Sequence, residues 1–210
     1  MAKRNTRERI ITCALSLFAQ KGYAGVSVKE IAEAVGIKDA SLYKHFAGKR
    51  QIFHSILEEM DRRYEAAAAV AGAAPGSFEE AAPVYGKMAT EELNKASTAL
   101  FLYFLHDEYA AGVRRMLTIE QYGHSALAAT FYERYIQAPL AFQSGIFELL
   151  QKEGKMRAGS PAIAALHFYG PIYLLLCRCD ACPEEEEQAL KILRQHVEQF
   201  TALYMKEEKE

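Results

Sequence analysis

Residues 27–49 read SVKEIAEAVGIKDASLYKHFAGK, and this stretch predicts two short helices joined by a tight turn. Ser27 and Glu30 have the spacing of a capping box, in which each side chain accepts a hydrogen bond from a backbone amide at the start of a helix. Gly36 ends that helix, because glycine tolerates the backbone angles of a tight turn. The second helix covers about 40–46, so the stretch has the dimensions of a helix-turn-helix unit.

Helical periodicity continues outward on both sides of this unit. Before it, apolar side chains recur at three- and four-residue spacings over 10–19, and Gly22 ends that helix. Beyond it, further helices are expected at about 49–65, 78–93, 96–105, 108–121, 125–153, 161–179 and 184–206. No alternating pattern of useful length predicts a β-strand. We therefore predict an all-α fold, with a three-helix N-terminal domain that contains the helix-turn-helix and a larger helical C-terminal domain.

The charge of the chain is unevenly distributed. The 210 residues carry a formal net charge of −2, which by itself argues against a nucleic-acid partner. Residues 1–55, however, hold ten Lys and Arg against four acidic residues, a formal charge of +6, and the rest of the chain holds −8. A basic quarter on an acidic body indicates a polyanionic partner for the N-terminal end alone.

Composition excludes several other classes of protein. Apolar runs such as Ile172–Cys177 are shorter than the ~18–20 residues of a membrane span, and the charged N-terminus lacks the apolar segment of a secretory signal. The chain has 4 cysteines, spread as Cys13, Cys177, Cys179 and Cys182, which is not a disulfide framework. We therefore expect a cytoplasmic protein with no membrane partner. The chain has no phosphate-binding glycine loop, His-Glu-x-x-His or Gly-x-Ser-x-Gly motif, so neither an enzyme, a catalytic residue nor a cofactor is expected.

The second helix of the unit carries side chains suited to DNA. In a helix-turn-helix this helix enters the major groove and presents its N-terminal residues to base edges. Its exposed positions are expected to be Lys38, Asp39, Ala40, Ser41, Tyr43, Lys44 and His45. Lysine and hydroxyl donors suit phosphate oxygens, and a small alanine allows close approach to a thymine methyl group. Lys49 begins the next helix, where its ammonium and the unpaired amides could hold a phosphate.

A longer pattern makes the assignment specific. The residues Phe18-Ala19-x-x-Gly22-Tyr23, Ser27-Val28-x-x-Ile31-Ala32-x-x-x-Gly36-Ile37 and Leu42-Tyr43-x-His45-Phe46-x-x-Lys49 resemble the DNA-binding domain of TetR-family transcriptional regulators over about residues 7–55. The resemblance implies a homodimeric repressor that binds a palindromic double-stranded DNA operator and is released by a small-molecule effector. It implies a DNA-binding domain at 1–50, a linking helix at about 49–70, and a ligand-binding and dimerisation domain at 71–210. The DNA contacts that it implies are Ser27, Lys29, Lys38, Ala40, Ser41, Tyr43, Lys44, His45 and Lys49.

Two positions depart from the family pattern. Lys38 stands where a Ser or Thr usually caps the recognition helix, so we expect that side-chain cap to be missing. Gly48 replaces the common Ser at the start of the fourth helix, which is an acceptable substitution at such a position.

The C-terminal part carries patterns but no sharp motif. The helices at about 161–179 and 184–206 are apolar on more than one face, and we expect them to form the homodimer interface. The middle helices are rich in aromatic residues, which favours an apolar or aromatic effector, although any one of these residues is more often plain core. The candidate pocket residues are Phe104, His106, Arg115, Tyr122, Phe131, Tyr135, Gln143 and His167.

Two alternative functions remain open at this point. Cys177, Cys179 and Cys182 form a dense thiol cluster, which could make the protein a thiol- or metal-responsive regulator on the same fold. Their spacing matches no standard zinc signature, so no metal site is predicted. The other alternative is a protein-interaction module of TetR-like fold that does not read DNA.

Overall fold

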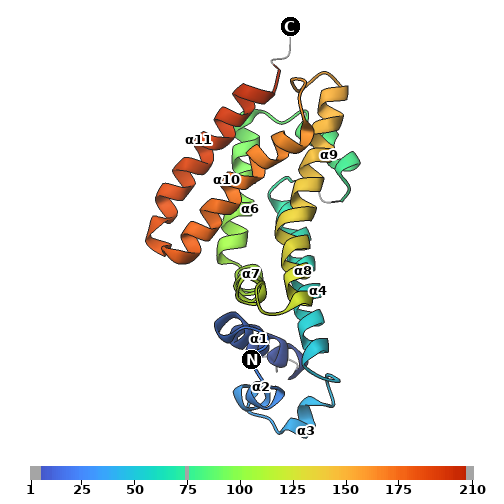
Figure 1. Ribbon diagram of the computed structural model, residues 1–210, viewed down its shortest axis with the longest axis vertical. Helices are drawn as coiled ribbons and strands as arrows, with labels where there is room; N and C mark the ends of the chain where they lie inside the picture. Colours follow the sequence, from blue (N-terminus) through green and yellow to red (C-terminus); the bar gives the residue numbers. More distant parts are fainter. Residues whose placement is uncertain (1–5, 74–75, 207–210) are drawn as a thin grey trace. The chain divides into compact units, whose positions relative to one another are not determined.

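The computed structural model describes residues 6–73 and 76–206, and within them the chain is helical, with no β-strand (Figure 1). This confirms the predicted all-α fold. The α-helices are α1 (Thr6–Lys21), α2 (Val28–Val35), α3 (Asp39–Leu42), α4 (Lys49–Val70), α5 (Phe78–Tyr85), α6 (Thr90–His106), α7 (Glu108–Glu120), α8 (Ser125–Tyr132), α9 (Ala138–Lys152), α10 (Pro161–Ala181) and α11 (Glu186–Tyr204).

The chain packs as two compact units. The first joins Met1–Tyr64 to Asp107–Glu133, so α7 and α8 pack with the N-terminal helices. The second joins Glu65–His106 to Arg134–Glu210 and contains α5, α6, α9, α10 and α11. The expected domains, a DNA-binding domain at 1–50 and a ligand-binding and dimerisation domain at 71–210, are defined by function, and that division stays a prediction. In packing terms, one middle segment of the chain belongs with the helix-turn-helix.

In the first unit, α1 lies between α2 and α7 (Figure 1). Its core is built from side chains that are fully shielded from solvent, namely Ile10, Phe18, Ile31, Leu42, Ile52, Ile56 and Val113. Gly112 lets α7 approach α1 closely, because a Cβ atom at this position would lie 2.9 Å from Cδ1 of Leu15. The N-terminal helices are therefore supported by α7 as well as by one another.

The second unit is held together by an aromatic cluster. The ring of Phe200 on α11 lies 4.9 Å from that of Phe168 on α10 and 5.3 Å from that of Phe147 on α9. Phe101 on α6 is 1% exposed and belongs to the same core. Such rings bury large apolar areas and account for much of the packing energy of a small helical unit.

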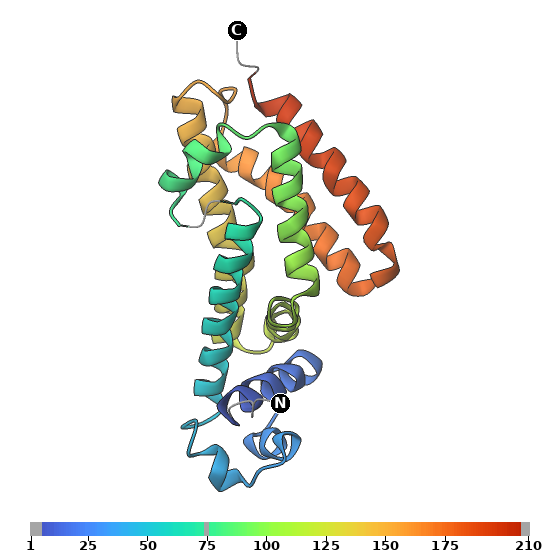
Figure 2. The same cartoon turned by 180° about the vertical axis from the view of Figure 1, so that it is seen from behind.

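Three of the predicted helices differ in the structure, and one of them is divided. The pattern at 78–93 predicts one helix, but α5 ends at Tyr85 and α6 begins at Thr90 (Figure 2). Gly86 is the C-cap of α5, and a carboxylate oxygen of Glu92 accepts a hydrogen bond from the amide of Ala89, at 2.9 Å, and so caps the start of α6. The pattern at 125–153 is likewise interrupted, by a π-helical turn at Glu133–Gln137 that precedes α9. The helix expected at 40–46 is also shorter and covers only Asp39–Leu42.

One helix of the second unit is unusually apolar. Among the described residues, α10 alone is long and apolar enough to cross a membrane, judged by its length and composition. Its apolar residues do not form one unbroken run, so the apolar runs of the sequence do not indicate it. Its apolar side chains lie on two faces. Phe168 and Leu175 are buried in the core, whereas Leu174 is 68% exposed. A core helix that is apolar on two faces can be as long and as apolar as a membrane span.

Candidate functional site

The helix-turn-helix has the local geometry that its sequence predicts. The Oγ atom of Ser27 accepts a hydrogen bond from the amide of Glu30 at 3.2 Å, and the Glu30 carboxylate accepts one from the amide of Ser27 at 2.8 Å. The bond from the Ser27 amide, with the neighbouring Lys21 ammonium, lowers the pKa of Glu30 to about 2. Gly36 ends α2 with a φ of 75°, in the left-handed region. The predicted capping box and glycine turn are therefore both present.

The short helix α3 turns its apolar side inward and its polar side outward. Leu42 and Phe46 are 0% and 1% exposed and fix this segment on the core of the first unit. Lys38 makes no side-chain cap, as expected from its departure from the family pattern. Tyr43 is 57% exposed. The outward surface of α3 is therefore polar, and the exposed lysines Lys38 and Lys44 flank it on either side.

The nine residues expected to contact DNA fall into two groups. Seven are exposed, namely Ser27, Lys29, Lys38, Ala40, Tyr43, Lys44 and His45, and two are half-buried, Ser41 and Lys49. The Lys29 ammonium lies 3.8 Å from the carboxylate of Glu33 in an exposed pair, which is weak in water. These positions are compatible with DNA contact, and the contacts themselves stay a prediction.

Lys49 is engaged within the protein. Its ammonium donates hydrogen bonds to the carbonyl oxygens of Tyr23 and Val26, at 2.8 and 2.7 Å, and lies 4.3 Å from the centre of the Tyr23 ring. Partial burial lowers the pKa of Lys49, and the carboxylates of Glu120 and Glu30 offset part of this effect. Two of its three protons hold the turn between α1 and α2, a role that the sequence reasoning did not anticipate.

Glu120 is a second residue that the sequence reasoning missed. It is the last residue of α7 and only 6% exposed, and its Oε1 atom accepts a hydrogen bond from the amide of Ala24 at 2.8 Å. Gly22 makes room for it, because a Cβ atom on Gly22 would lie 2.5 Å from Oε1. No signal in the sequence distinguishes this glutamate from an exposed one at a helix end.

Three basic residues, Lys3, Arg4 and Arg7, stand near the N-terminus. Lys3 and Arg4 lie outside the described residues. Arg7 donates a hydrogen bond to Oγ of Ser55 at 2.9 Å, and its guanidinium lies 4.9 Å from the centre of the Phe46 ring. Arg7 therefore links α1 to α4 and to the segment after α3.

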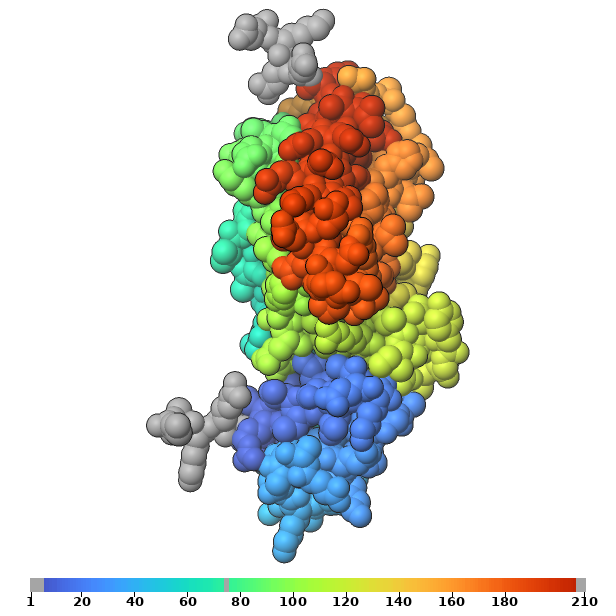
Figure 3. Space-filling model, turned by 90° about the vertical axis from the view of Figure 1, so that its left-hand side faces the viewer, coloured from blue at the N-terminus to red at the C-terminus, as the bar shows by residue number. Residues whose placement is uncertain are grey.

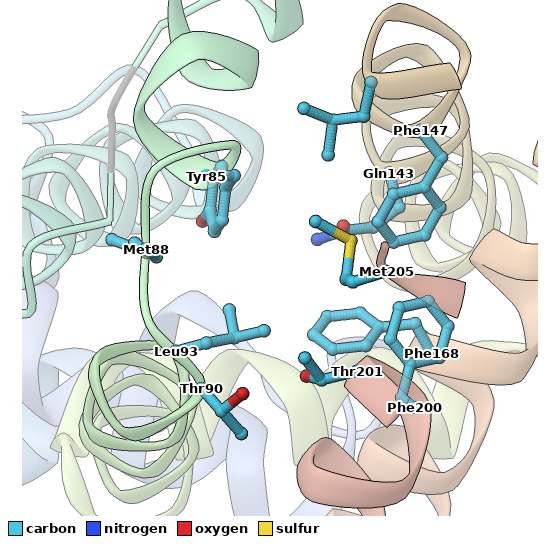
Figure 4. A pocket seen from close by; sticks show the side chains of 11 residues that line it. Tyr85, Met88, Thr90, Leu93, Gln143, Phe147, Phe168, Phe200, Thr201 and Met205 are labelled. Carbon is cyan, nitrogen blue, oxygen red and sulfur yellow. The ribbon is translucent and has the colours of Figure 1, made fainter. Parts of the chain in front are cut away.

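The second unit contains a small cavity of about 40 Å³ (Figure 4). Tyr85, Met88, Thr90 and Leu93 lie on one side of it, and Gln143, Phe147, Leu150, Phe168, Phe200, Thr201 and Met205 line the rest. Its lining is apolar and aromatic, with a few hydroxyl and amide groups and no charged side chain.

The eight candidate pocket residues do not gather around one cavity. Arg115, Tyr122 and Phe131 lie in the first unit, whereas Phe104, His106, Tyr135, Gln143 and His167 lie in the second. Of these, Gln143 lines the cavity described above. Tyr122 is 92% exposed, and the His106 ring lies 3.0 Å from the Glu186 carboxylate. The cavity residues Phe147 and Phe168 belong to the aromatic residues of the middle helices but not to the eight candidates, and Tyr85 was not predicted at all.

The three clustered cysteines differ in environment. Cys177 is exposed, Cys179 is buried and Cys182 is half-buried. In the described part of the chain, no group of three His, Cys, Asp or Glu side chains could hold a metal ion. The metal-responsive alternative thus finds no site among these residues.

Comparison with known proteins connects this geometry to a family. Residues 10–56 match the family model for bacterial regulatory proteins of the tetR family. The chain is 25% identical over 205 residues to YttP of Bacillus subtilis, a probable HTH-type transcriptional regulator, covering 98% of this chain and 91% of YttP. It is 47% identical over 47 residues to IcaR of Staphylococcus aureus, the negative regulator of the biofilm operon icaADBC, covering 22% of this chain and 25% of IcaR.

Solved structures share the fold. SmeT of Stenotrophomonas maltophilia in complex with triclosan matches with a TM-score of 0.67 at 19% identity, covering 98% of this chain and 94% of SmeT. The two sequence relatives are transcriptional regulators, not enzymes.

Proposed function

Because the chain belongs to the TetR family of DNA-binding transcriptional regulators, we propose that it is a homodimeric cytoplasmic repressor that binds a palindromic operator and is released by a small-molecule effector. The observation that carries the proposal is the outward-facing polar surface of α2 and α3, held in place by Leu42 and Phe46. Repression in particular is supported by IcaR, a negative regulator that matches over 47 residues.

The operator contacts divide by chemistry. Lys38 and Lys44 are exposed and suit phosphate oxygens, and Ala40 at the start of α3 allows close approach to a base. Tyr43 offers its hydroxyl to a phosphate. Ser27 and Lys29 at the start of α2 complete the surface with His45 after α3, while Ser41 and Lys49 are more shielded. Neutralised phosphates supply much of the affinity of such an interface.

The proposed dimer uses the second apolar face of α10. Ile163, Leu166 and Leu174 are 51%, 51% and 68% exposed, and their spacing places them along one side of the helix. Leu203 on α11 is 64% exposed, and the two helices form the surface of the second unit that Figure 3 turns toward the reader. A second copy of the chain covers such a face under two-fold symmetry, which the palindromic operator mirrors.

The proposed effector is neutral and apolar. The cavity that Gln143 lines has no charged side chain, and its polar groups are hydroxyls and an amide that can orient a ligand. At about 40 Å³ it holds little more than a water molecule, so an organic effector requires a more open state of the unit. The SmeT–triclosan complex supports a small-molecule effector on this fold.

The test is selection of DNA by the purified protein. The protein is incubated with a randomised duplex pool, and the bound duplexes are sequenced and footprinted. We expect a palindrome with half-sites about one helical turn, ~34–36 Å, apart. Lys44→Glu should abolish the selection, and Lys87→Glu, at an exposed position of the second unit, should preserve it. A wild-type protein that enriches no sequence refutes the proposal and favours the protein-interaction alternative.

A further inference from the structure

The turn between α1 and α2, residues 22–26, is held by two side chains from other helices. Lys49, the first residue of α4, binds the carbonyl oxygens of Tyr23 and Val26. Glu120, the last residue of α7, binds the amide of Ala24. We propose that Lys49 and Glu120 are positioning residues, which use this turn to set the orientation of the recognition surface and hence the spacing of the two half-sites that the dimer reads. The inference rests on the proposed function.

The turn at 22–26 connects the recognition helices to helices that lead toward the second unit. Residue 26 is followed directly by Ser27, the N-cap of α2, so the bonds to 23, 24 and 26 fix the backbone from which the helix-turn-helix begins. The two helices that hold the turn, α4 and α7, are connected in the chain to the second unit. Helix α4 continues from the first unit into the second at residues 64 and 65, and α7 begins directly after the second unit's segment ends at residue 106. A displacement of either helix therefore acts on the turn.

The chemistry of Glu120 supports a positioning role over simple packing. A carboxylate that is 6% exposed loses most of its hydration, and an apolar side chain of similar size would fill the same space without that cost. The carboxylate accepts a directed hydrogen bond from one backbone amide, and its negative charge raises the pKa of the Lys49 ammonium. Both effects fix the turn relative to α7 and α4.

Gly22 offers a perturbation with a matched control. Gly22 has a φ of 75°, and a Cβ atom there meets the Glu120 carboxylate at 2.5 Å. Gly154 in the second unit also has a φ of 75°, but a Cβ atom there meets nothing within 4 Å. Gly22→Ala and Gly154→Ala therefore impose the same backbone strain and differ in the contacts of the added methyl group, which at residue 22 meets the Glu120 carboxylate and, at 3.0 Å, Cγ2 of Ile119.

The experiment measures spacing preference as well as affinity. The probe is the duplex that the wild-type protein selects, compared with the same duplex carrying one extra central base pair. For the wild type we expect the insertion to weaken binding by about tenfold or more, because it changes the distance and rotation between half-sites. For Glu120→Ala and Gly22→Ala we expect weaker binding to the original duplex and a penalty for the insertion of less than about threefold.

Two variants separate positioning from loss of folded protein. Glu120→Gln retains the acceptor for the Ala24 amide and should keep more of the spacing preference than Glu120→Ala. Adding Glu120→Ala to Gly22→Ala removes the overlapping carboxylate and should raise affinity above that of Gly22→Ala alone. A variant that is only less stable loses active protein but retains the wild-type ratio of the two dissociation constants.

The outcomes are distinct. If the folded Glu120 variants retain the wild-type ratio, the positioning role is wrong and the proposed function stands. If Gly154→Ala changes the ratio as much as Gly22→Ala, backbone strain explains the effect and the inference is again wrong. If the wild-type protein selects no duplex, the proposed function is wrong, and the inference, which rests on it, is wrong as well.

Discussion

Replacement of Lys44 by Gln tests the DNA interface most directly. Lys44 is exposed, and no ion pair engages it in the described part of the chain, so its charge is available to a phosphate. A dimer that loses two phosphate contacts should have a salt slope, the change in log K per unit of log salt, that is less negative by about 1.8. The same relation gives a loss of affinity of roughly 60-fold near 0.1 M salt, relative to 1 M salt.

The assay is fluorescence anisotropy of a labelled selected duplex, between roughly 50 and 200 mM salt. Lys87→Gln is the matched control, because Lys87 is an exposed lysine of the second unit. The thermal unfolding midpoint of Lys44→Gln should equal that of the wild type, since the residue is exposed. An unchanged salt slope for Lys44→Gln would refute the assignment of Lys44 to a phosphate, whatever happens to the affinity.

Three further changes test the fold and the assembly. The carboxyl group of Glu30 has a folded-state pKa of about 2 against an ordinary 4.5, so its stabilisation of the protein is complete above the ordinary value and is lost as the pH falls toward 2. The unfolding midpoint of Glu30→Gln should therefore be below that of the wild type at neutral pH, and the difference should shrink in acid. Phe200→Ala should lower the free energy of unfolding in urea by about 3–5 kcal/mol, because the ring is 4% exposed and packs against other rings, and a loss below about 1 kcal/mol would contradict that packing. Leu174→Glu should convert the dimer to a monomer in sedimentation equilibrium, while Val70→Glu, at a position that is 91% exposed, should leave it dimeric; a dimeric Leu174→Glu protein would exclude this face as the interface.

The features predicted correctly are those that neighbouring residues determine. The capping box joins Ser27 and Glu30 across three residues, and Gly36 needs only its own backbone freedom. The uncapped start of α3 follows from Lys38 itself. The break between α5 and α6 is also local, because Glu92 caps the amide of Ala89, but alanine carries no capping oxygen and so gives no visible signal.

The features that escaped prediction depend on tertiary contacts. Glu120 and Ala24 are 96 positions apart in the chain, and Lys49 is 26 positions from Tyr23. Helical periodicity identifies which face of a helix is apolar, but not which other helix covers that face. A glutamate at a helix end and a lysine at a helix start are ordinarily solvated, so their burial depends on the packing of α7 and α4 around one turn.

The candidate pocket residues are divided between the two units for the same reason, and their division bears on the mechanism of release. Arg115 and Tyr122 stand in the aromatic-rich middle part of the sequence, yet they belong to the unit that contains the helix-turn-helix. The cavity belongs entirely to the other unit. An effector bound there shares no lining residue with the DNA-binding unit. We propose that it acts through α4 and α7, which are joined in the chain to the other unit and carry the side chains that hold the turn at 22–26. Under the proposed mechanism, the Glu120→Ala variant should therefore bind the effector as the wild type does and yet release its operator less completely when the effector is added.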